Sequence, residues 1–429
     1  MSVVADILKE VPLPNMVRIR QRFEATELTD VAGELQQQIR RTEISARVKE
    51  NMRIAVSVGS RGIAELPLIV KTVVAELKRL GACPFIVPAM GSHGGATAAG
   101  QIEVLANLGI TQDTAGCPIV SSMETVELGS IANGLPVLID KNAYEADGIV
   151  VINRIKAHNA FSGQVESGLA KMITIGLGKQ KGADSCHAFG FGKMPEHIVE
   201  MTNIKLKKAN FLFGVGTVEN AYDKVSRIVV VEPKDIIETD KKLLLEAKRN
   251  LPRILFEPIE VLIVDQIGKE FSGGGMDCHI VGRASTTFVT PATRSPVKMA
   301  VLDITDNSHG NACGMGLADV TTRRLFNKID FEITYPNIIT STATNSGRIP
   351  LIMESDRLAI QCAVKTCNVP DWNKLRMVRI PNSLRLEEIY ISEAMLPEAA
   401  EQKAVLVLTE PAEFVFDSAG NLSDIGFGR

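Results

Sequence analysis

The sequence lacks several patterns that identify common classes of protein. Its seven cysteines are dispersed over 429 residues without a CxxC pair, which argues against a zinc ribbon or an ordinary iron–sulfur site. An odd, scattered set of thiols is typical of a reducing compartment. Apolar runs, such as residues 148–152 and 404–408, are far shorter than the roughly 20 residues that cross a bilayer. We therefore expect a soluble, cytoplasmic protein.

The chain also lacks a recognisable targeting segment and a block of positive charge. Residues 1–23 mix acidic and basic side chains, unlike the basic and then apolar segments of a signal peptide. The formal net charge of −3 comes from 47 basic and 50 acidic residues, without a long run of Lys or Arg. This charge pattern provides no electrostatic footprint for nucleic acid or for an anionic membrane. The expected partner is a small molecule.

The chain length exceeds the size at which one hydrophobic core usually stops growing, so two domains are expected. From residue 52 short apolar strands alternate with amphipathic helices, which predicts a doubly wound α/β domain with a mostly parallel sheet. The segment 250–258 holds two prolines between a charged helix and a new strand, and it is the predicted linker and hinge. We thus expect an N-terminal cofactor-binding and catalytic domain, 1–250, and a smaller C-terminal domain, 251–429, that closes over the substrate.

The C-terminal domain is predicted to be α/β or α+β. Strands are expected at residues 259–268 and 298–306, and a helix is expected at 317–328. A further helix is expected at 356–366, with Ser355 as its N-cap.

Three loops of the N-terminal domain follow predicted strands and carry side chains suited to acid–base chemistry. They contain Arg61 in GSRG, His93 in GSHGG and His158 in RIKAHNAFSGQ. Open α/β sheets bind ligands at the carboxyl ends of their strands, so these loops should converge. Each residue alone is more often a solvated or backbone-bonded side chain, but together they suggest a site. An Arg binds a carboxylate through two parallel hydrogen bonds, and a His exchanges protons near neutral pH.

The third loop continues into a glycine-rich segment that contains Lys171, Lys179, Lys181 and His187. Glycine density allows close approach of the backbone to a ligand, and exposed N–H groups bind phosphate. A phosphate-bearing cofactor would fit this segment, although a glycine-rich surface loop with solvated lysines is an equal alternative. The remaining histidines have no assigned role: His197, His279 and His309.

Two familiar nucleotide-binding motifs are missing from the sequence. No GxGxxG follows the first strand with an acidic residue about 20 positions later, as a dinucleotide site requires. The segment GLGKQKG lacks the GK[ST] ending of a Walker A loop. Both kinds of site are therefore excluded.

Taken together, these motifs resemble the nickel-dependent lactate racemase family. The matching stretches are GSRG with Arg61, GSHG with His93, and HNAFSGQVESGLAK with His158 and Lys171. His187 lies sixteen residues beyond Lys171, at the spacing of the family's nickel ligand.

The resemblance implies a nickel pincer cofactor, pyridinium-3,5-bisthiocarboxylic acid mononucleotide. Lys171 would anchor it covalently and His187 would ligate the nickel, while Arg61 would hold the substrate carboxylate. His93 and His158 would form the acid/base pair while hydride passes from the α-carbon of a 2-hydroxy acid to the cofactor and back. The implied activity is that of a 2-hydroxy acid racemase or epimerase. It would depend on partner proteins that synthesise the cofactor and insert the nickel.

This sequence departs from the family pattern at two places. The interval from His158 to Lys171 is three residues longer than in the family and GGRK is replaced by SGLAK, so Lys179 or Lys181 remains an alternative anchor. In the C-terminal domain, the family places a Gln and a Lys near the substrate. In the corresponding region of this sequence, the possible replacements are Lys269, Asp277 and Arg283. A polar wall of this kind would favour a larger or more hydroxylated acid than lactate.

Two other functions remain open at this point. Lys171 as an unmodified amine would form a Schiff base with a keto acid or sugar acid, as in a lyase or dehydratase. A catalytically silent anion-binding protein of the same fold is the non-enzymatic alternative.

Overall fold

The computed structural model describes residues 3–60 and 62–427 and divides into two compact units. One unit is the continuous segment Glu24–Leu251, and the other joins the start of the chain, up to Phe23, to everything from Pro252 onward. One crossing between the units therefore falls inside the expected linker.

The other crossing, near Phe23, was not expected from the sequence. The N-terminal strand β1 (Met16–Gln21) pairs antiparallel with β14 (Glu388–Ser392) and with β15 (Val405–Val407). The expected domain 1–250 must therefore be corrected at its start, because the backbone hydrogen bonds of β1 are made within the C-terminal unit.

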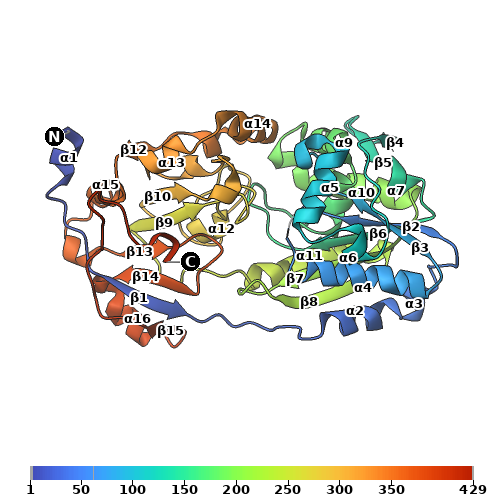
Figure 1. The fold of residues 1–429 in the computed structure, drawn as a ribbon, viewed down its shortest axis with the longest axis horizontal. Helices are drawn as coiled ribbons and strands as arrows, with labels where there is room; N and C mark the ends of the chain where they lie inside the picture. The colour runs from blue at the N-terminus through green and yellow to red at the C-terminus, as the bar shows by residue number, and fades with distance from the viewer. Residues whose placement is uncertain (1–2, 61, 428–429) are drawn as a thin grey trace. The chain divides into compact units, whose positions relative to one another are not determined.

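The unit Glu24–Leu251 is built on a five-stranded sheet in the order β3-β2-β6-β7-β8 (Figure 1). The first three pairings are parallel, and β7 pairs antiparallel with β8. The strands are β2 (Arg53–Val58), β3 (Cys83–Pro88), β6 (Gly148–Arg154), β7 (Phe211–Glu219) and β8 (Val225–Val231), and a separate hairpin consists of β4 (Thr125–Ser130) and β5 (Pro136–Asp140).

Helices cover both faces of this sheet. On one face α4 (Leu66–Arg79) buries Ile69, Val73 and Leu77, which repeat at helical spacing, in one core with α2 (Val31–Ile39) and β2. On the other face α11 (Ile236–Arg249) buries Leu243 and Leu244 against β7. The doubly wound, mostly parallel α/β fold is thereby confirmed. The same unit also contains α5 (Ala98–Asn107), α7 (Lys141–Tyr144), α8 (Leu169–Lys171), the π-helical turn Met172–Gly176, α9 (Lys179–His187) and α10 (Met194–Lys208).

The other unit contains a mixed eight-stranded sheet in the order β12-β11-β10-β9-β13-β14-β1-β15 (Figure 1). Its parallel part runs from β12 to β13, and its antiparallel part contains β14, β1 and β15. The other strands of this sheet are β9 (Val261–Ile267), β10 (Lys298–Ile304), β11 (Val320–Thr322), β12 (Leu351–Met353) and β13 (Met377–Ile380). The helices of the unit include α1 (Val3–Leu8), α12 (Cys278–Val281), α13 (Arg323–Asn327), α14 (Phe331–Ser341), α15 (Asp356–Thr366) and α16 (Leu396–Glu401).

Two sequence predictions in this unit have different outcomes. Helix α15 occupies the predicted range, and the Ser355 hydroxyl accepts the Leu358 N–H at 3.4 Å as its N-cap. The helix expected at 317–328 is wrong in its first half, where Val320–Thr322 form strand β11 beside β10. These three residues are β-branched, and the hydroxyls of Thr321 and Thr322 donate to carbonyls of β10, so parallel pairing outweighs helix formation.

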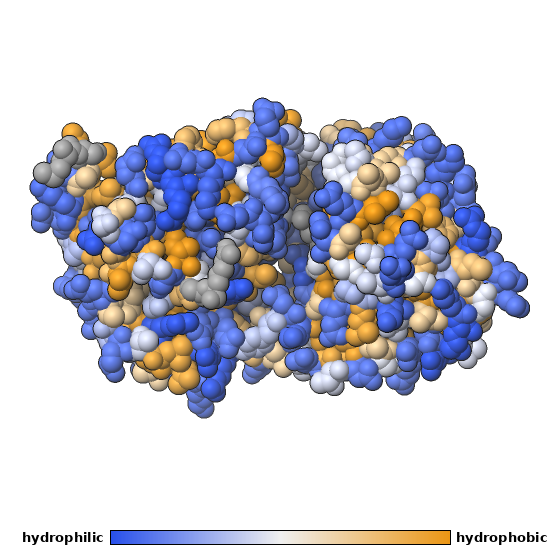
Figure 2. All heavy atoms as spheres, viewed as in Figure 1, coloured by the Kyte–Doolittle hydropathy of each residue, from blue (hydrophilic) through white to orange (hydrophobic). Residues whose placement is uncertain are grey.

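The surface is mainly hydrophilic on the face shown in Figure 2, where apolar side chains form separate patches. Among the helices of residues 3–60 and 62–427, none combines the length and the apolar character that a bilayer-spanning helix needs.

Candidate functional site

Three loops of the unit Glu24–Leu251 leave neighbouring parallel strands at the same edge of the sheet. They are residues 59–60 and 62–65 after β2, 89–97 after β3 and 155–168 after β6. The expected position of these loops at one edge of the sheet is therefore confirmed. Arg61 lies outside the described residues, so its predicted role stays a prediction.

His93 lies in the second loop, where its ring is oriented by the backbone. Its Nδ1 is 2.8 Å from the carbonyl oxygen of Met90. Inside the loop, the buried Gln101 amide donates to the carbonyls of Gly91, at 2.9 Å, and of His93, at 3.2 Å. Gly94 has φ +68°, and a Cβ there would lie 2.6 Å from the amide nitrogen of Gln101. The tight turn that presents His93 thus requires a glycine at this position.

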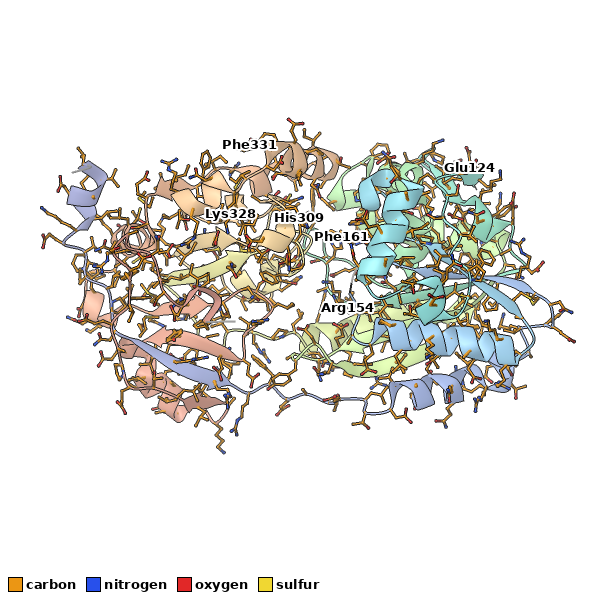
Figure 3. The ribbon with its side chains drawn as sticks, in the orientation of Figure 1. Glu124, Arg154, Phe161, His309, Lys328 and Phe331 are labelled. Atoms are coloured by element: carbon orange, nitrogen blue, oxygen red, sulfur yellow. The ribbon has the colours of Figure 1, made fainter. Side chains whose placement is uncertain are left out.

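His158 lies in the third loop, which is organised by the buried Glu166. The Glu166 carboxylate accepts the N–H of His158 at 2.7 Å and the N–H of Gly163 at 3.2 Å, and it pairs with Lys248 at 2.6 Å. The ring of His158 stacks on Phe161, labelled in Figure 3, with centroids 4.3 Å apart. The backbone position and the ring plane of His158 are therefore both fixed.

The two histidines are held in different tautomers. A carbonyl oxygen only accepts, so Nδ1 of His93 carries the hydrogen toward Met90 and Nε2 of the neutral ring has the lone pair. In His158 the order is reversed, because the N–H of Ala160 donates to Nδ1 at 3.1 Å and the hydrogen of the neutral ring must lie on Nε2. His93 is thus prepared to accept a proton at Nε2, and His158 is prepared to donate a hydrogen bond from Nε2.

His187 is the last residue of α9 and carries its lone pair on Nε2. Its Nδ1 lies 2.6 Å from the carbonyl oxygen of Ala183, one turn earlier, so Nδ1 carries the hydrogen. Burial lowers the pKa of His187, and the charge of Lys171 lowers it further, against the opposing effects of the Ala183 carbonyl and Asp184. His187 is consequently a neutral imidazole with an Nε2 suited to a metal, and it lies within the electrostatic influence of Lys171.

Lys171 ends α8 and is half-buried, directly before the π-helical turn. The two alternative anchors differ from it. Lys181 is exposed, whereas the ammonium of Lys179 is completely buried and lies 2.6 Å from the Pro88 carbonyl and 2.8 Å from the Gln101 side-chain oxygen. Lys179 also forms an ion pair with Asp140 at 3.2 Å. These contacts hold its ammonium inside the core, so the structure argues against Lys179 as an anchor.

Comparison with known proteins identifies most of this unit. The family model described as the lactate racemase N-terminal domain matches residues 8–197. This part of the chain is a lactate racemase N-terminal domain. The matched range includes the three loops, Lys171 and His187.

Two solved structures are similar to the chain at low sequence identity. One is a crystal structure of a protein from Thermotoga maritima, with a TM-score of 0.48, 15% identity, and coverage of 65% of this chain and 72% of that chain. The other is the lactate racemase apoprotein from Thermoanaerobacterium thermosaccharolyticum, with a TM-score of 0.47, 14% identity, and coverage of 80% and 86%. No curated protein matches the chain.

His197, the last residue matched as lactate racemase N-terminal domain, has a structural role. Its Nδ1 donates to the carbonyl of Cys186 at 3.1 Å, and the Asn133 amide donates to its Nε2 at 3.0 Å. With both ring nitrogens satisfied inside the core, His197 fixes the end of α9 next to His187.

The residues singled out outside the lactate racemase N-terminal domain lie in the C-terminal unit. Arg283 pairs with Asp319 at 2.8 Å and donates to the Leu317 carbonyl, so structural contacts occupy its guanidinium. Lys269 donates to the Gly273 carbonyl at 2.7 Å. His309, labelled in Figure 3, is exposed and follows a short 3-10 helix.

Asp277 and His279 belong to a cluster of possible metal ligands in the same unit. Together with Cys278 they place one ligand atom each within 4.8 Å of one another. The Asp277 carboxylate also accepts the backbone N–H of His279, as the N-cap of α12.

Sequence reasoning missed the buried side chains that hold the lactate racemase N-terminal domain loops in place. Gln101 supports the loop of His93, Glu166 organises the loop of His158, and Asp240 accepts the N–H groups of Leu169 and Ala170 before Lys171. The sequence does contain a signal for Asp240, because this ionisable residue lies among the apolar, buried positions of α11.

Proposed function

We propose that the protein is a racemase or epimerase that inverts the configuration at the α-carbon of a small 2-hydroxy acid. The observation that carries this proposal lies inside the lactate racemase N-terminal domain. The neutral imidazole of His187 has its lone pair on Nε2, and the charge of Lys171 lowers its pKa further.

The residues present fit the nickel pincer cofactor that the family uses. Lys171 provides an amine for a covalent thioamide link, and His187 provides one nitrogen ligand whose tautomer is fixed by Ala183. Nitrogen and sulfur donors suit nickel. The lowered pKa of His187 keeps its imidazole unprotonated at neutral pH, as metal ligation requires.

When bound, the cofactor would supply a reversible acceptor for the hydride of the substrate α-carbon. The chain supplies the proton chemistry and the orientation of the substrate. Arg61 is the proposed partner of the carboxylate, which would keep the substrate and the keto acid in place between the two half-reactions.

Because His93 and His158 have opposite tautomers, we propose different roles for the two histidines. His93 would take the hydroxyl proton at Nε2 while its Nδ1–H remains bonded to the Met90 carbonyl, an orientation that stabilises the resulting imidazolium. His158 would donate from Nε2 to the same oxygen, and protonation of its Nδ1 would break the bond from Ala160. This asymmetry is our refinement of the expectation that His93 and His158 form an acid/base pair.

The test is expression together with proteins that synthesise the cofactor and insert nickel, followed by intact mass, nickel content and peptide mapping. We expect an adduct on Lys171, about one nickel per chain, and interconversion of the two configurations of a 2-hydroxy acid in a chiral chromatographic screen. Lys181→Ala is the matched control for Lys171→Ala, because Lys181 is exposed on the following helix.

An adduct on Lys181, or none under conditions that load a known lactate racemase, would contradict the proposal. In the latter case, borohydride trapping of a keto acid on Lys171 would indicate Schiff-base chemistry instead. Ligand binding without turnover, unchanged in His93→Ala and His158→Ala, would indicate an anion-binding protein.

A further inference from the structure

The turn that carries Lys171 is held from two sides by buried charged residues. Asp240 on α11 accepts the N–H of Leu169 at 3.1 Å and the N–H of Ala170 at 2.8 Å. Lys205 on α10 donates to the carbonyls of Ile173 and Thr174, at 2.8 and 2.9 Å. Asp240 and Lys205 are each only 1% exposed.

Burial of these two ionisable side chains in the core costs free energy. Transfer of an ionised side chain from water into a protein interior is unfavourable unless polar groups compensate it. Within residues 3–60 and 62–427, neither Asp240 nor Lys205 forms an ion pair with an oppositely charged side chain. Their compensation comes from the backbone groups on either side of Lys171.

The backbone of this segment is shaped to receive both side chains. A Cβ on Gly168 would lie 2.7 Å from the carboxyl carbon of Asp240, so only a glycine lets the carboxylate approach the start of α8. After Lys171 the helix widens into a π turn, closed by the Leu177 N–H and the Met172 carbonyl at 2.9 Å. Such turns occur often at functional sites.

A third contact ties the segment to α10. The Thr202 hydroxyl donates to the Ala170 carbonyl at 3.0 Å and lies 2.9 Å from the Thr174 hydroxyl. The peptide groups on both sides of Lys171 are thus bonded to side chains of other helices.

We propose that Asp240 and Lys205 are positioning residues that fix the helical turn bearing Lys171 and thereby direct its amine toward the position of cofactor attachment. This inference rests on the proposed role of Lys171. By holding the N–H groups before Lys171 and the carbonyls after it, the two side chains prevent the turn from rotating or unwinding. A single apolar contact could not impose this restraint, because it lacks direction.

Burial affects the titration of the groups around this turn. It raises the pKa of Asp240 to about 7 and lowers the pKa of Lys205 to about 7.

The experiment measures amide hydrogen exchange in protein that carries no cofactor. Asp240→Asn retains one acceptor oxygen, and Asp240→Leu retains none. We expect exchange at Leu169 and Ala170 to be about tenfold faster in Asp240→Asn and faster again in Asp240→Leu, since each lost charge-assisted bond removes about a factor of ten in protection. Glu238→Gln, an exposed acid on the same helix, is the matched control and should change exchange less than twofold.

The order of the two variants separates positioning from packing. A purely structural role predicts that apolar Leu is tolerated at least as well as Asn in a buried position, with any change in exchange spread over the whole unit. An increase confined to residues 168–177 and larger for Leu supports the proposal. A uniform increase, or a smaller effect for Leu, overturns it.

The consequence for Lys171 is measured separately, as the fraction of chains with an adduct after expression with the cofactor-synthesis proteins. Lys205→Met should reduce this fraction at least fivefold, whereas Lys207→Met, exposed on the same helix, should not. An unchanged fraction in Lys205→Met and in Asp240→Leu overturns the proposal. Absence of an adduct in the unsubstituted protein overturns the proposed function instead, and the exchange comparison still decides whether the two charges hold the turn.

Discussion

Replacement of Lys179 by methionine removes one partner of a completely buried ion pair. Lys179 and Asp140 are both 0% exposed, and methionine has nearly the length of lysine but no charge or donor. The substitution leaves Asp140 as a buried carboxylate that still accepts the Ala143 N–H at the start of α7. It also removes the donor to Gln101, which supports the carbonyl groups of the His93 loop.

The expected cost follows from these contacts. Loss of one partner of a buried ion pair typically destabilises a protein by ~3–5 kcal/mol, because the other charge remains buried without compensation. Asp140→Asn keeps an acceptor for the Ala143 N–H. The double variant Asp140→Asn/Lys179→Met should therefore be more stable than Lys179→Met alone by at least ~1.5 kcal/mol.

Urea unfolding followed by circular dichroism measures this loss. The single tryptophan, Trp372, lies in the other unit, so its fluorescence provides an internal reference that should not change. Lys181→Met on the same helix is the control and should lie within ~0.5 kcal/mol of the unsubstituted protein. A cost below ~1 kcal/mol for Lys179→Met, or no recovery in the double variant, would refute the role of Lys179 as a structural cation. In the loaded protein, Lys171 should keep its adduct when Lys179 is replaced.

Three further predictions concern the site and its supports. His93→Gln should lower kcat by about 10²- to 10⁴-fold, as expected for the loss of a general base. His158→Gln should lower kcat only about 10- to 100-fold, because the glutamine amide still donates a hydrogen bond. Equal losses would argue for two equivalent bases. His187→Ala should abolish nickel retention, measured by elemental analysis, while intact mass still shows the adduct on Lys171; retained nickel would remove His187 as a ligand. The pKa of Asp240, raised from its ordinary 3.8 to about 7, means that the folded chain holds a proton that the unfolded chain has released between these pH values. Stability should therefore fall as pH rises through this window, by up to ~1.4 kcal/mol per pH unit, and Asp240→Asn should flatten that slope in urea titrations at several pH values.

The alternation of strands and helices was readable from the sequence, because it depends on local patterns. The burial of β2 and the helical spacing of Ile69, Val73 and Leu77 are properties of neighbouring residues, and they predicted the doubly wound sheet. The edge of the sheet that gathers the loops of His93 and His158 follows from parallel strands and short connections. Motif spacing in the sequence likewise identifies Lys171 and His187 as candidates.

Tertiary structure decided what local patterns leave open. Strand β1 joins the C-terminal unit because its pairing partners, β14 and β15, lie more than 350 residues further along the chain, beyond any sequence window. Lys179 and Lys171 look alike in a glycine-rich segment, and only the burial of Lys179 against Asp140 and Gln101 separates them. The tautomers of His93 and His158 depend on which backbone group faces each Nδ1, a carbonyl in one case and an N–H in the other. Residue types determined the chemistry available to this chain, and the directions of hydrogen bonds in the folded state decided which residue can perform each part of it.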